Sequence, residues 1–406
     1  MKSFDLIVVG GGPGGIFAAI TAAEKGFKVA LLEKNKRIGN KILVAGSGKC
    51  NLTHTGKPKD FLDKYGENGR FLKEALNKFS PDKLKEFFAD NGLPLVLVEE
   101  SGKFFPATFS SVDVVNLLRE TLTRLNVQIV ESFKIEEILK MGDEFHIVSD
   151  KEEYRAKIVL LATGGKSYPG VGTTGDGYVF AKSLGHKIVP PQPALAPIYV
   201  KDYLFEELSG ISFQGVKITF WKENRKLIEK IGSVLLTHTN FSGPGILDNS
   251  RYVQSETSLE INYLGLEYEV FNKDVIEAIN EDGRKTIKKY LLKYSLPERF
   301  VKKILKISEI QEDMKLSELS KIKREELAKM LTSNKMEISK VGNFETAMVT
   351  KGGVSLEEVN SKTMESKKVK GLYFAGEVLD IDGDTGGYNI QGACSMGVLA
   401  AKSMTK

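Results

Sequence analysis

Residues 4–33 have the sequence FDLIVVGGGPGGIFAAITAAEKGFKVALLE, in which two apolar runs flank a glycine-rich turn and a helical pattern. Residues 4–9 form a continuous apolar run bounded by glycines, which is typical of a strand buried on both faces of a parallel sheet. Residues 14–25 carry apolar side chains at helical spacing and stop at Gly26, a frequent C-terminal stop. Residues 27–33 form a second apolar run, so the stretch predicts a strand–helix–strand unit.

The turn between the first strand and the helix contains the pattern G-x-G-x-x-G in the run Gly10-Gly11-Gly12-Pro13-Gly14-Gly15. This pattern gains meaning because it follows a predicted strand and opens a predicted helix. Gly10 permits the tight turn, Gly12 lets the backbone approach a pyrophosphate, and Gly15 lets the helix pack closely on the strand. The start of the helix then offers N–H groups and a partial positive charge to phosphates.

Glu33 ends the second predicted strand. A carboxylate at this point accepts hydrogen bonds from an adenosine ribose and repels a 2′-phosphate, which disfavours NADP at this site. The alternative is a cluster of turn glycines with a surface glutamate. Because a Rossmann unit alone does not separate FAD from NAD, the rest of the chain must decide between them.

Composition indicates an ordinary globular protein. The 406 residues are 41% hydrophobic and 27% charged, and 58 Lys and Arg nearly balance 53 Asp and Glu to a net charge of +5. The length favours two or three domains, and the small net charge gives little reason to expect a nucleic-acid partner. Two cysteines imply no disulfide framework, so we expect a reducing cytoplasm. We expect no secretory signal, no membrane span and, with four dispersed histidines, no metal site.

The remaining chain predicts an α/β main domain with an insertion. Helices are expected twice in 70–92, the second starting at Ser80-Pro81-Asp82, and again over 112–125. Strands are expected at 127–130, 133–140, 144–149 and 157–162, while residues 34–60 show little periodicity. A proline cluster near residue 190 marks a boundary, followed by short strands to about 265 and Lys- and Glu-rich helices to about 335. We therefore expect a Rossmann-type FAD-binding domain in 1–190 and 343–406, and an inserted mixed β and helical substrate domain in 191–342.

Two later motifs favour FAD. Ala162-Thr163-Gly164 ends a buried strand, and residues 371–377 form a strand that ends in Gly376-Glu377. At these residues the sequence resembles the glutathione-reductase-like FAD superfamily, in which the acid of a late Gly-Asp motif binds the ribityl chain. Glu377 stands in place of the usual Asp, which leaves its contact with the ribityl chain open.

Four further segments narrow the resemblance: 39–53 (GNKILVAGSGKCNLT), 172–178 (GTTGDGY), 237–244 (THTNFSGP), and Thr350 onward through Gly386-Gly387-Tyr388-Asn389 to Ala393. Together they resemble the HI0933-like, or BaiN-type, family of bacterial flavoproteins across nearly the whole chain. The resemblance implies an FAD-dependent oxidoreductase that reduces a C=C bond in a steroid-like or other hydrophobic substrate, or oxidises a small amine.

Motifs and resemblance together predict one set of cofactor-binding residues. These are Gly10, Gly12, Pro13, Gly14, Gly15, Glu33, Lys34, Lys41, Gly48, Cys50, Asn51, Ile135, Ala162, Thr163, Gly164, Gly165, Asp176, Gly376, Glu377, Gly387, Tyr388, Asn389 and Gln391. Glycines in 39–53 let the backbone approach a ligand, and Lys41 can meet a phosphate. A helix that starts near Tyr388 can aim its N-terminus at flavin N1 and the C2 oxygen, where the reduced ring is anionic.

Three residues are candidates for catalysis: Cys50, Tyr168 and His238. The resemblance places Cys50 near the flavin ring, but a small buried residue without a redox role explains it equally well. No C-x-x-C pair exists, which argues against a disulfide-reductase mechanism. Tyr168 and His238 are candidate proton donors, although a lone histidine is more often structural. The acidic run Asp380, Asp382 and Asp384 resembles the start of a calcium loop but lacks the closing glutamate, since Gln391 stands there.

The sequence therefore predicts an FAD-dependent oxidoreductase that acts on a small molecule which enters between the domains, with no nucleic-acid or membrane partner. Only one dinucleotide fingerprint is present, so NAD(P)H, if used, visits the flavin transiently. Two alternatives stay open: a flavin-dependent enzyme that modifies tRNA, and a non-catalytic FAD redox sensor. Substrate, electron donor and oligomeric state are left undetermined.

Overall fold

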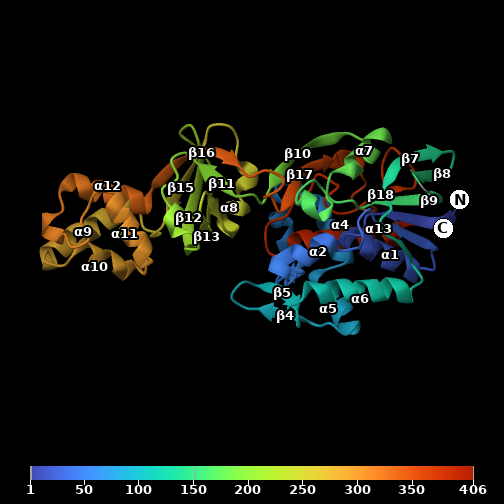
Figure 1. Ribbon diagram of the computed structural model, residues 1–406, viewed down its shortest axis with the longest axis horizontal. Coiled ribbons are helices and arrows are strands. Elements are labelled where there is room, and N and C mark those ends of the chain that lie inside the picture. The colour runs from blue at the N-terminus through green and yellow to red at the C-terminus, as the bar shows by residue number, and fades with distance from the viewer. Residues whose placement is uncertain (1, 151, 406) are drawn as a thin grey trace. The chain divides into compact units, whose positions relative to one another are not determined.

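The computed structural model describes residues 2–150 and 152–405, which fold into two units (Figure 1). Unit 1 comprises Met1–Ala194 and Phe344–Lys406, and unit 2 comprises Leu195–Asn343. Each unit has its own hydrophobic core. Within the described residues every helix is too short or too polar to span a lipid bilayer.

Unit 1 is built on a seven-stranded sheet with the order β6-β2-β1-β9-β8-β7 and with β18 also paired to β9. The strands are β1 (Lys2–Val9), β2 (Val29–Leu32), β6 (Gln128–Val130), β7 (Ile135–Met141), β8 (Glu144–Ser149), β9 (Glu153–Leu161) and β18 (Leu372–Phe374). The pairs that involve β1, β2, β6, β18 and the end of β9 are parallel, whereas β7 and β8 form an antiparallel branch. The α/β Rossmann-type class predicted from the sequence is confirmed.

Strand β1 lies inside the sheet, between β2 and β9, and both of its faces are covered. Leu6, Ile7 and Val8 are fully buried, as the continuous apolar run predicted. Helix α1 (Pro13–Glu24) follows the glycine turn and packs against α13 (Tyr388–Ser403), which comes from the far end of the chain. The contact is close because a Cβ on Gly397 would lie 2.1 Å from the Gly14 carbonyl oxygen. Glycines in both helices therefore allow the N-terminal helix α1 and the C-terminal helix α13 to pack closely.

The other helices of unit 1 are α2 (Asn40–Val44), α3 (Pro58–Leu62), α4 (Lys73–Lys78), α5 (Pro81–Asp90), α6 (Ser111–Arg124) and α7 (Asp176–Ser183). The predicted start of α5 is confirmed, since the Ser80 hydroxyl accepts the Lys83 N–H as an N-cap. Residues 34–60 contain more regular secondary structure than the weak periodicity of their sequence predicted. They contain α2, α3 and strand β3 (Thr53–His54), which pairs with β5 (Lys103–Pro106) and through it with β4 (Leu95–Val98).

Most of the proline cluster near residue 190 lies in a strand. β10 (Ile188–Ala194) pairs with β17 (Val349–Val354), and its register shifts between Val189 and Gln192. Pro190 and Pro191 occupy this shift, where the missing N–H groups remove no regular ladder bond. The chain leaves unit 1 only after Ala194.

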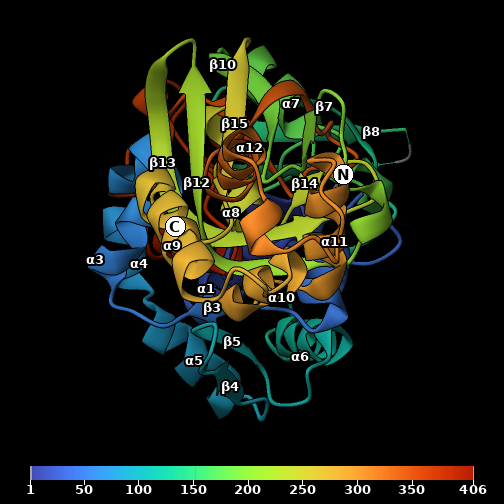
Figure 2. The ribbon, with the colours of Figure 1, turned by 90° about the vertical axis from the view of Figure 1, so that its left-hand side faces the viewer.

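Unit 2 combines a closed six-stranded barrel with a group of helices (Figure 2). The barrel strands are β11 (Ile198–Val200), β12 (Ser212–Lys222), β13 (Arg225–Leu236), β14 (Phe241–Ser242), β15 (Thr257–Asn262) and β16 (Asn334–Val341). The helices are α8 (Pro244–Leu247), α9 (Tyr268–Asp282), α10 (Ile287–Leu291), α11 (Glu298–Ile307) and α12 (Lys321–Thr332). Figure 2 shows the long strands β12 and β13 side by side, and aromatic residues such as Phe213 and Phe300 fill the space between barrel and helices.

Candidate functional site

The glycine turn between β1 and α1 is close-packed at both ends and open in the middle. A Cβ on Gly10 would lie 2.5 Å from the Ala162 carbonyl oxygen, and one on Gly15 would lie 2.0 Å from the Gly10 oxygen. A Cβ on Gly12, by contrast, would meet no atom nearer than the Ala162 oxygen at 4.0 Å. Pro13 is the first helical residue, and no side chain caps the helix. The open N-terminus of α1 therefore offers backbone N–H groups to a ligand.

Glu33 follows β2 and points at this turn. One carboxylate oxygen accepts the Gly11 N–H at 2.8 Å, and the other accepts the Asn35 backbone N–H at 2.8 Å and its side-chain amide at 2.6 Å. The residue is only 8% exposed. A buried carboxylate beside the first helix turn is the arrangement that the ribose of a dinucleotide requires.

Lys34 and Asp176 join the end of β2 to the start of α7. The Lys34 ammonium lies 2.5 Å from the Asp176 carboxylate and 2.5 Å from the Thr174 hydroxyl. Burial alone would raise the pKa of Asp176, but hydrogen bonds from Lys34 and Thr174 outweigh it and hold the pKa below its ordinary value. Both residues were predicted to bind the cofactor, and the structure pairs them with each other.

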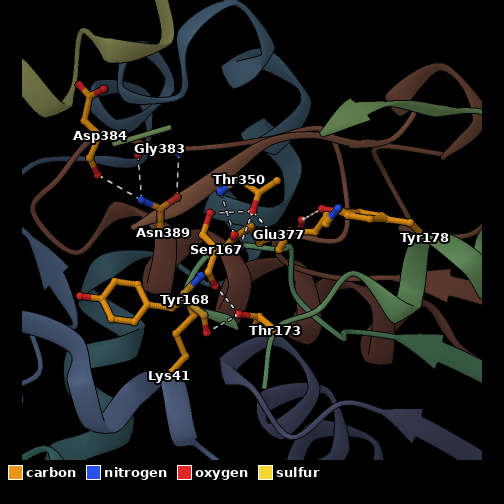
Figure 3. A network of polar contacts seen from close by, with 11 residues as sticks. Lys41, Ser167, Tyr168, Thr173, Tyr178, Thr350, Glu377, Gly383, Asp384 and Asn389 are labelled. Atoms are coloured by element: carbon orange, nitrogen blue, oxygen red, sulfur yellow. Dashed lines mark hydrogen bonds and ion pairs between the residues drawn. The ribbon is translucent and has the colours of Figure 1, made fainter. Parts of the chain in front are cut away.

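A second glutamate, Glu377, lies after β18 in a network of polar contacts (Figure 3). One of its carboxylate oxygens is 2.8 Å from the Lys41 ammonium, and the other accepts the Thr350 N–H at 2.9 Å. Lys41 was predicted to meet a phosphate of the cofactor, and in the structure its ammonium group pairs with the Glu377 carboxylate. The two charges attract each other, and both side chains are mostly buried.

The segment Ala162 to Gly165 follows β9 and touches this network. A Cβ on Gly165 would lie 2.4 Å from the Thr350 hydroxyl and 2.6 Å from the Glu377 carboxylate, so Glu377 fits only beside a glycine. The Thr163 hydroxyl is buried and makes no hydrogen bond within the described residues. Gly376 and Gly164 both have positive φ angles, 80° and 74°.

The N-terminus of α13 meets the loop that follows Cys50. Gly387 has φ of 93° and caps the helix without a side chain, and a Cβ there would lie 2.8 Å from the Asn51 side-chain oxygen. That oxygen and the Thr53 hydroxyl are buried, and neither has a hydrogen-bond partner in the part of the chain that the structure describes. Unpaired buried acceptors are rare because each costs about 1–3 kcal/mol, so these two oxygens are suited to accept hydrogen bonds from a bound group.

Three predicted ligands at the start of α13 have structural partners. Gln391 is fully buried, and its amide donates to the Phe79 carbonyl at 3.1 Å and to Ser395 at 3.0 Å. Gln391 was predicted to bind the cofactor. Tertiary packing turns its amide nitrogen toward these two partners, and its side-chain oxygen is buried without a hydrogen-bond partner in the described residues. Asn389 closes the preceding turn by accepting the Gly383 N–H at 2.7 Å and donating to its carbonyl at 2.8 Å. The Tyr388 ring stacks on His54, with centroids 5.1 Å apart.

Cys50 does not have the setting of a reactive thiol. It is fully buried, and burial raises its pKa to about 12. The thiol is therefore protonated at neutral pH, and the alternative of a small buried residue fits better than a redox role. Nearby Gly48 has φ of 83° and open space around it.

The remaining predicted residues lie in different places. Ile135 begins β7 and is partly buried, close in sequence to Phe133, whose N–H donates to the Glu33 carbonyl at 2.9 Å. Tyr168 lies on the loop after β9 and is 38% exposed. His238 is exposed on the turn between β13 and β14, in unit 2. Asp380 accepts the Gly352 N–H at 2.9 Å, and burial raises its pKa.

The residues fit FAD. Gly12 leaves space at the start of α1, Glu33 lies beside it, and buried acceptors on Asn51 and Thr53 lie at the start of α13. Both helix N-termini favour negative charge, as a diphosphate and a reduced flavin ring carry. No group of three His, Cys, Asp or Glu side chains in the described residues is placed to hold a metal ion.

Comparison with known proteins shows the family of the chain. The model of the family described as HI0933-like protein Rossmann domain matches residues 4–403. The chain belongs to this family. The HI0933-like chain is 31% identical over 408 residues to the 3-dehydro-bile acid delta(4,6)-reductase of Clostridium scindens, with 98% of both chains covered. It is also 31% identical over 411 residues to the ribosomal RNA dihydrouridine synthase of Escherichia coli, with 99% and 100% covered.

Solved structures share the fold at low identity. A 3-ketosteroid delta1-dehydrogenase from Sterolibacterium denitrificans aligns with a TM-score of 0.53 and 13% identity over 99% of both chains. The open conformation of a flavocytochrome c3 fumarate reductase aligns with a TM-score of 0.51 and 15% identity, over 99% of this chain and 78% of the other. Together with the family, this fold identifies the HI0933-like chain as a flavoprotein oxidoreductase that uses FAD.

Sequence reasoning missed two residues that organise the site. Asn35 binds the Glu33 carboxylate and reaches the Val171 carbonyl at 3.4 Å. Thr350 connects Glu377 to the loop after β9. Asn35 follows Glu33 closely, so a turn-forming Asn beside a ribose-binding acid was a usable signal. Thr350 begins one of the segments that carry the family resemblance, but its role did not follow from the sequence, because its partners come from distant parts of the chain.

Proposed function

We propose that this flavoprotein is a reductase that adds two hydrogen atoms across a carbon–carbon double bond conjugated to a carbonyl group. One observation carries the proposal. Two relatives that match almost the whole chain are named for a bile acid delta(4,6)-reductase and a dihydrouridine synthase, and both names describe the addition of hydrogen to a ring double bond. A reaction type common to both is the best estimate for a third member of the family.

The site supports such chemistry. Bound FAD would supply a hydride to one carbon of the double bond. Glu33 and the start of α1 would hold the adenosine diphosphate end, and Glu377 with Lys41 would lie along the ribityl chain. The start of α13, with the buried acceptors of Asn51 and Thr53, would face the polar edge of the ring. A positive helix end at that edge stabilises the anionic reduced ring and raises its potential.

A nicotinamide nucleotide is proposed as the source of electrons. The G-x-G-x-x-G run of residues 10–15 connects β1 directly to α1, and Glu33 would commit it to the adenosine of FAD. The second match to this pattern, residues 170–175, does not directly follow a strand. NADH or NADPH would therefore reach the flavin without a Rossmann domain of its own and would leave before the substrate binds. Such alternation predicts ping-pong kinetics.

RNA is the second candidate substrate class. It rests on the dihydrouridine synthases of Escherichia coli and Haemophilus influenzae, each 31% identical to this chain. The bile acid reductase is equally similar, so identity does not rank the two classes. We favour the small molecule because the net charge of +5 on 406 residues gives little electrostatic attraction for a nucleic acid.

Anaerobic half-reactions test the proposal. The FAD-loaded protein is mixed with NADH or NADPH until the flavin is bleached, and the reduced enzyme is then mixed with an unsaturated steroid ketone, its saturated analogue or a uridine-containing RNA. We expect the unsaturated ketone to reoxidise the flavin and to gain two hydrogens by mass spectrometry, with the saturated analogue as the matched inactive control. A flavin that only oxygen reoxidises would favour a redox sensor, and reoxidation by RNA alone would favour the second candidate.

A further inference from the structure

Tyr168 has an unusual combination of a fixed backbone and a free side chain. Its φ and ψ angles are 61° and 56°, the left-handed region, which costs a residue other than glycine roughly 1 kcal/mol or more. The side chain is 38% exposed. In Figure 3 the ring points away from Glu377 and Thr173. Strain of this kind persists only where the surroundings impose it, and it is common at functional sites.

Hydrogen bonds on both sides of Tyr168 impose this conformation. The Tyr168 N–H donates to the Phe344 carbonyl at 2.9 Å. The Tyr168 carbonyl accepts the Val171 N–H at 3.0 Å and the Thr173 hydroxyl at 3.1 Å, and the same hydroxyl also contacts the Ser167 carbonyl. Hydrogen bonds therefore hold the peptide groups on both sides of Tyr168 in place.

Thr350 anchors the residues before Tyr168. Its side chain is fully buried, and its hydroxyl oxygen accepts the Lys166 N–H at 2.8 Å and the Ser167 N–H at 3.0 Å, and lies 2.9 Å from the Ser167 hydroxyl. The Thr350 N–H donates to Glu377. One threonine thus connects the carboxylate of the cofactor site with the loop that carries Tyr168 (Figure 3).

Other tyrosines of unit 1 differ from Tyr168. The Tyr65 hydroxyl donates to the Tyr388 carbonyl at 2.6 Å, and the Tyr178 hydroxyl lies 3.5 Å from the Glu377 carbonyl. Burial raises the pKa of both phenols well above the ordinary value. The Tyr168 hydroxyl makes no hydrogen bond to any residue in 2–150 or 152–405. Its proton is therefore available to a bound molecule.

We propose that Tyr168 is the proton donor of the reduction and that Thr350 is the residue that positions it. The inference rests on the proposed function. With a hydride delivered to one carbon, the electron pair of the double bond moves to the other carbon and its carbonyl. The Tyr168 hydroxyl gives its proton to that second carbon, and the phenolate takes a proton from water. The two electrons come from the nicotinamide nucleotide that reduced the flavin beforehand.

Four variants of the FAD-loaded protein test this pair: Tyr168→Phe, Thr350→Val, Thr350→Ser and the double variant Tyr168→Phe/Thr350→Val. Tyr168→Phe should slow reoxidation of the reduced flavin by the unsaturated ketone about 100-fold, a typical general-acid contribution, and should remove the solvent deuterium isotope effect. Thr350→Val, which keeps the shape and loses the hydroxyl, should slow the same step about tenfold. Thr350→Ser should restore most of the rate.

The double variant separates positioning from a merely structural role. If Thr350 acts through Tyr168, then Thr350→Val adds nothing to the loss already caused by Tyr168→Phe. Flavin reduction by NADH or NADPH should be unchanged in Tyr168→Phe. Thr121→Val is the matched control, because Thr121 is also buried in unit 1 and its hydroxyl bonds only within α6, to the Leu117 carbonyl at 2.9 Å.

A measurement on the apoprotein needs no turnover. Hydrogen exchange at the Lys166 and Ser167 amides should be faster in Thr350→Val than in wild type, because this variant lacks the hydroxyl oxygen that accepts both N–H groups. Exchange at the same amides should be unchanged in Thr121→Val. Unchanged exchange in Thr350→Val would overturn the role of Thr350. Reoxidation of Tyr168→Phe at the wild-type rate, or additive losses in the double variant, would also overturn the inference. Failure of wild type to reduce any unsaturated carbonyl, with normal exchange behaviour, would instead overturn the proposed function.

Discussion

Two glutamates, Glu33 and Glu377, follow parallel strands of the same sheet, and they are held in opposite ways. Glu33 accepts N–H groups of the glycine turn and of Asn35, all within one strand–helix–strand unit. Glu377 is held by Lys41 and Thr350, which are 336 and 27 residues away along the chain. The first site is therefore a local property of a motif, whereas the second exists only when three distant segments meet.

This difference between Glu33 and Glu377 predicts how each of the two positions should respond to mutation. Backbone N–H groups cannot be moved without moving the fold, so damage around Glu33 should reduce both stability and FAD binding. Side chains around Glu377 can rearrange, and Lys41 is 28% exposed, so damage there should be milder. Variants at Gly15, Glu33, the pair Lys41 and Glu377, and Asp176 should therefore differ in the size of their effects.

Gly15→Ala should have the largest effect. The new Cβ would lie 2.0 Å from the Gly10 carbonyl oxygen, which is backbone and cannot rotate away. We expect a loss of about 3 kcal/mol in the free energy of unfolding and of most FAD binding, since overpacking costs about 1–3 kcal/mol. Urea unfolding and FAD fluorescence measure both. Gly170→Ala is the control, because a Cβ there meets nothing within 4 Å; equal losses in both variants would contradict the prediction.

Glu33→Gln should rank second. The amide would place a donor against the Gly11 N–H or against the Asn35 donors, and one buried N–H would lose its acceptor. We expect a loss of about 1–3 kcal/mol in the free energy of unfolding and weaker FAD binding by calorimetry. Glu24→Gln, at the exposed end of α1, should change neither. A Glu33→Gln protein with wild-type affinity would remove the basis for assigning the adenosine end.

The pair Lys41 and Glu377 should show a smaller, shared effect. In a double-mutant cycle with Lys41→Met and Glu377→Gln, we expect a coupling energy of about 1 kcal/mol in FAD affinity. Either single change leaves one mostly buried charge unpaired, whereas the double change removes both charges. Additive effects would show that the two side chains act on FAD independently.

Asp176→Asn should have the smallest effect, and only at low pH. The folded-state pKa of Asp176 lies below its ordinary value of 3.8, so its contribution is present above that value and is lost as pH falls through the folded-state pKa. We expect the unfolding free energy of wild type to fall more steeply on acidification than that of Asp176→Asn. The side chain is 40% exposed, which limits the difference. Asp90→Asn, on the exposed end of α5, should follow wild type; parallel acid curves for wild type and Asp176→Asn would contradict the prediction.

Much of unit 1 followed from sequence pattern alone. The apolar run of β1, the proline and serine at the start of α5 and the glycine before α13 each specify local backbone geometry. The contact partners of individual side chains were harder to predict. Lys41 and Gln391 were both predicted to bind the cofactor, but their contacts with Glu377, Phe79 and Ser395 were not predicted, because the sequence gives a residue's chemistry without its neighbours.

The glycine turn, the family and the FAD-dependent class of oxidoreductase could be inferred from the sequence, because backbone turns, helix starts and glycine spacing are local and depend on consecutive residues. The buried state of the Cys50 thiol, the pairing of Lys41 with Glu377, and the hydrogen bonds of Thr350 to the loop of Tyr168 could be found only in the folded structure. These are contacts between residues far apart in the chain. Their formation depends on packing, burial and the electrostatics of the folded core, which no short pattern encodes.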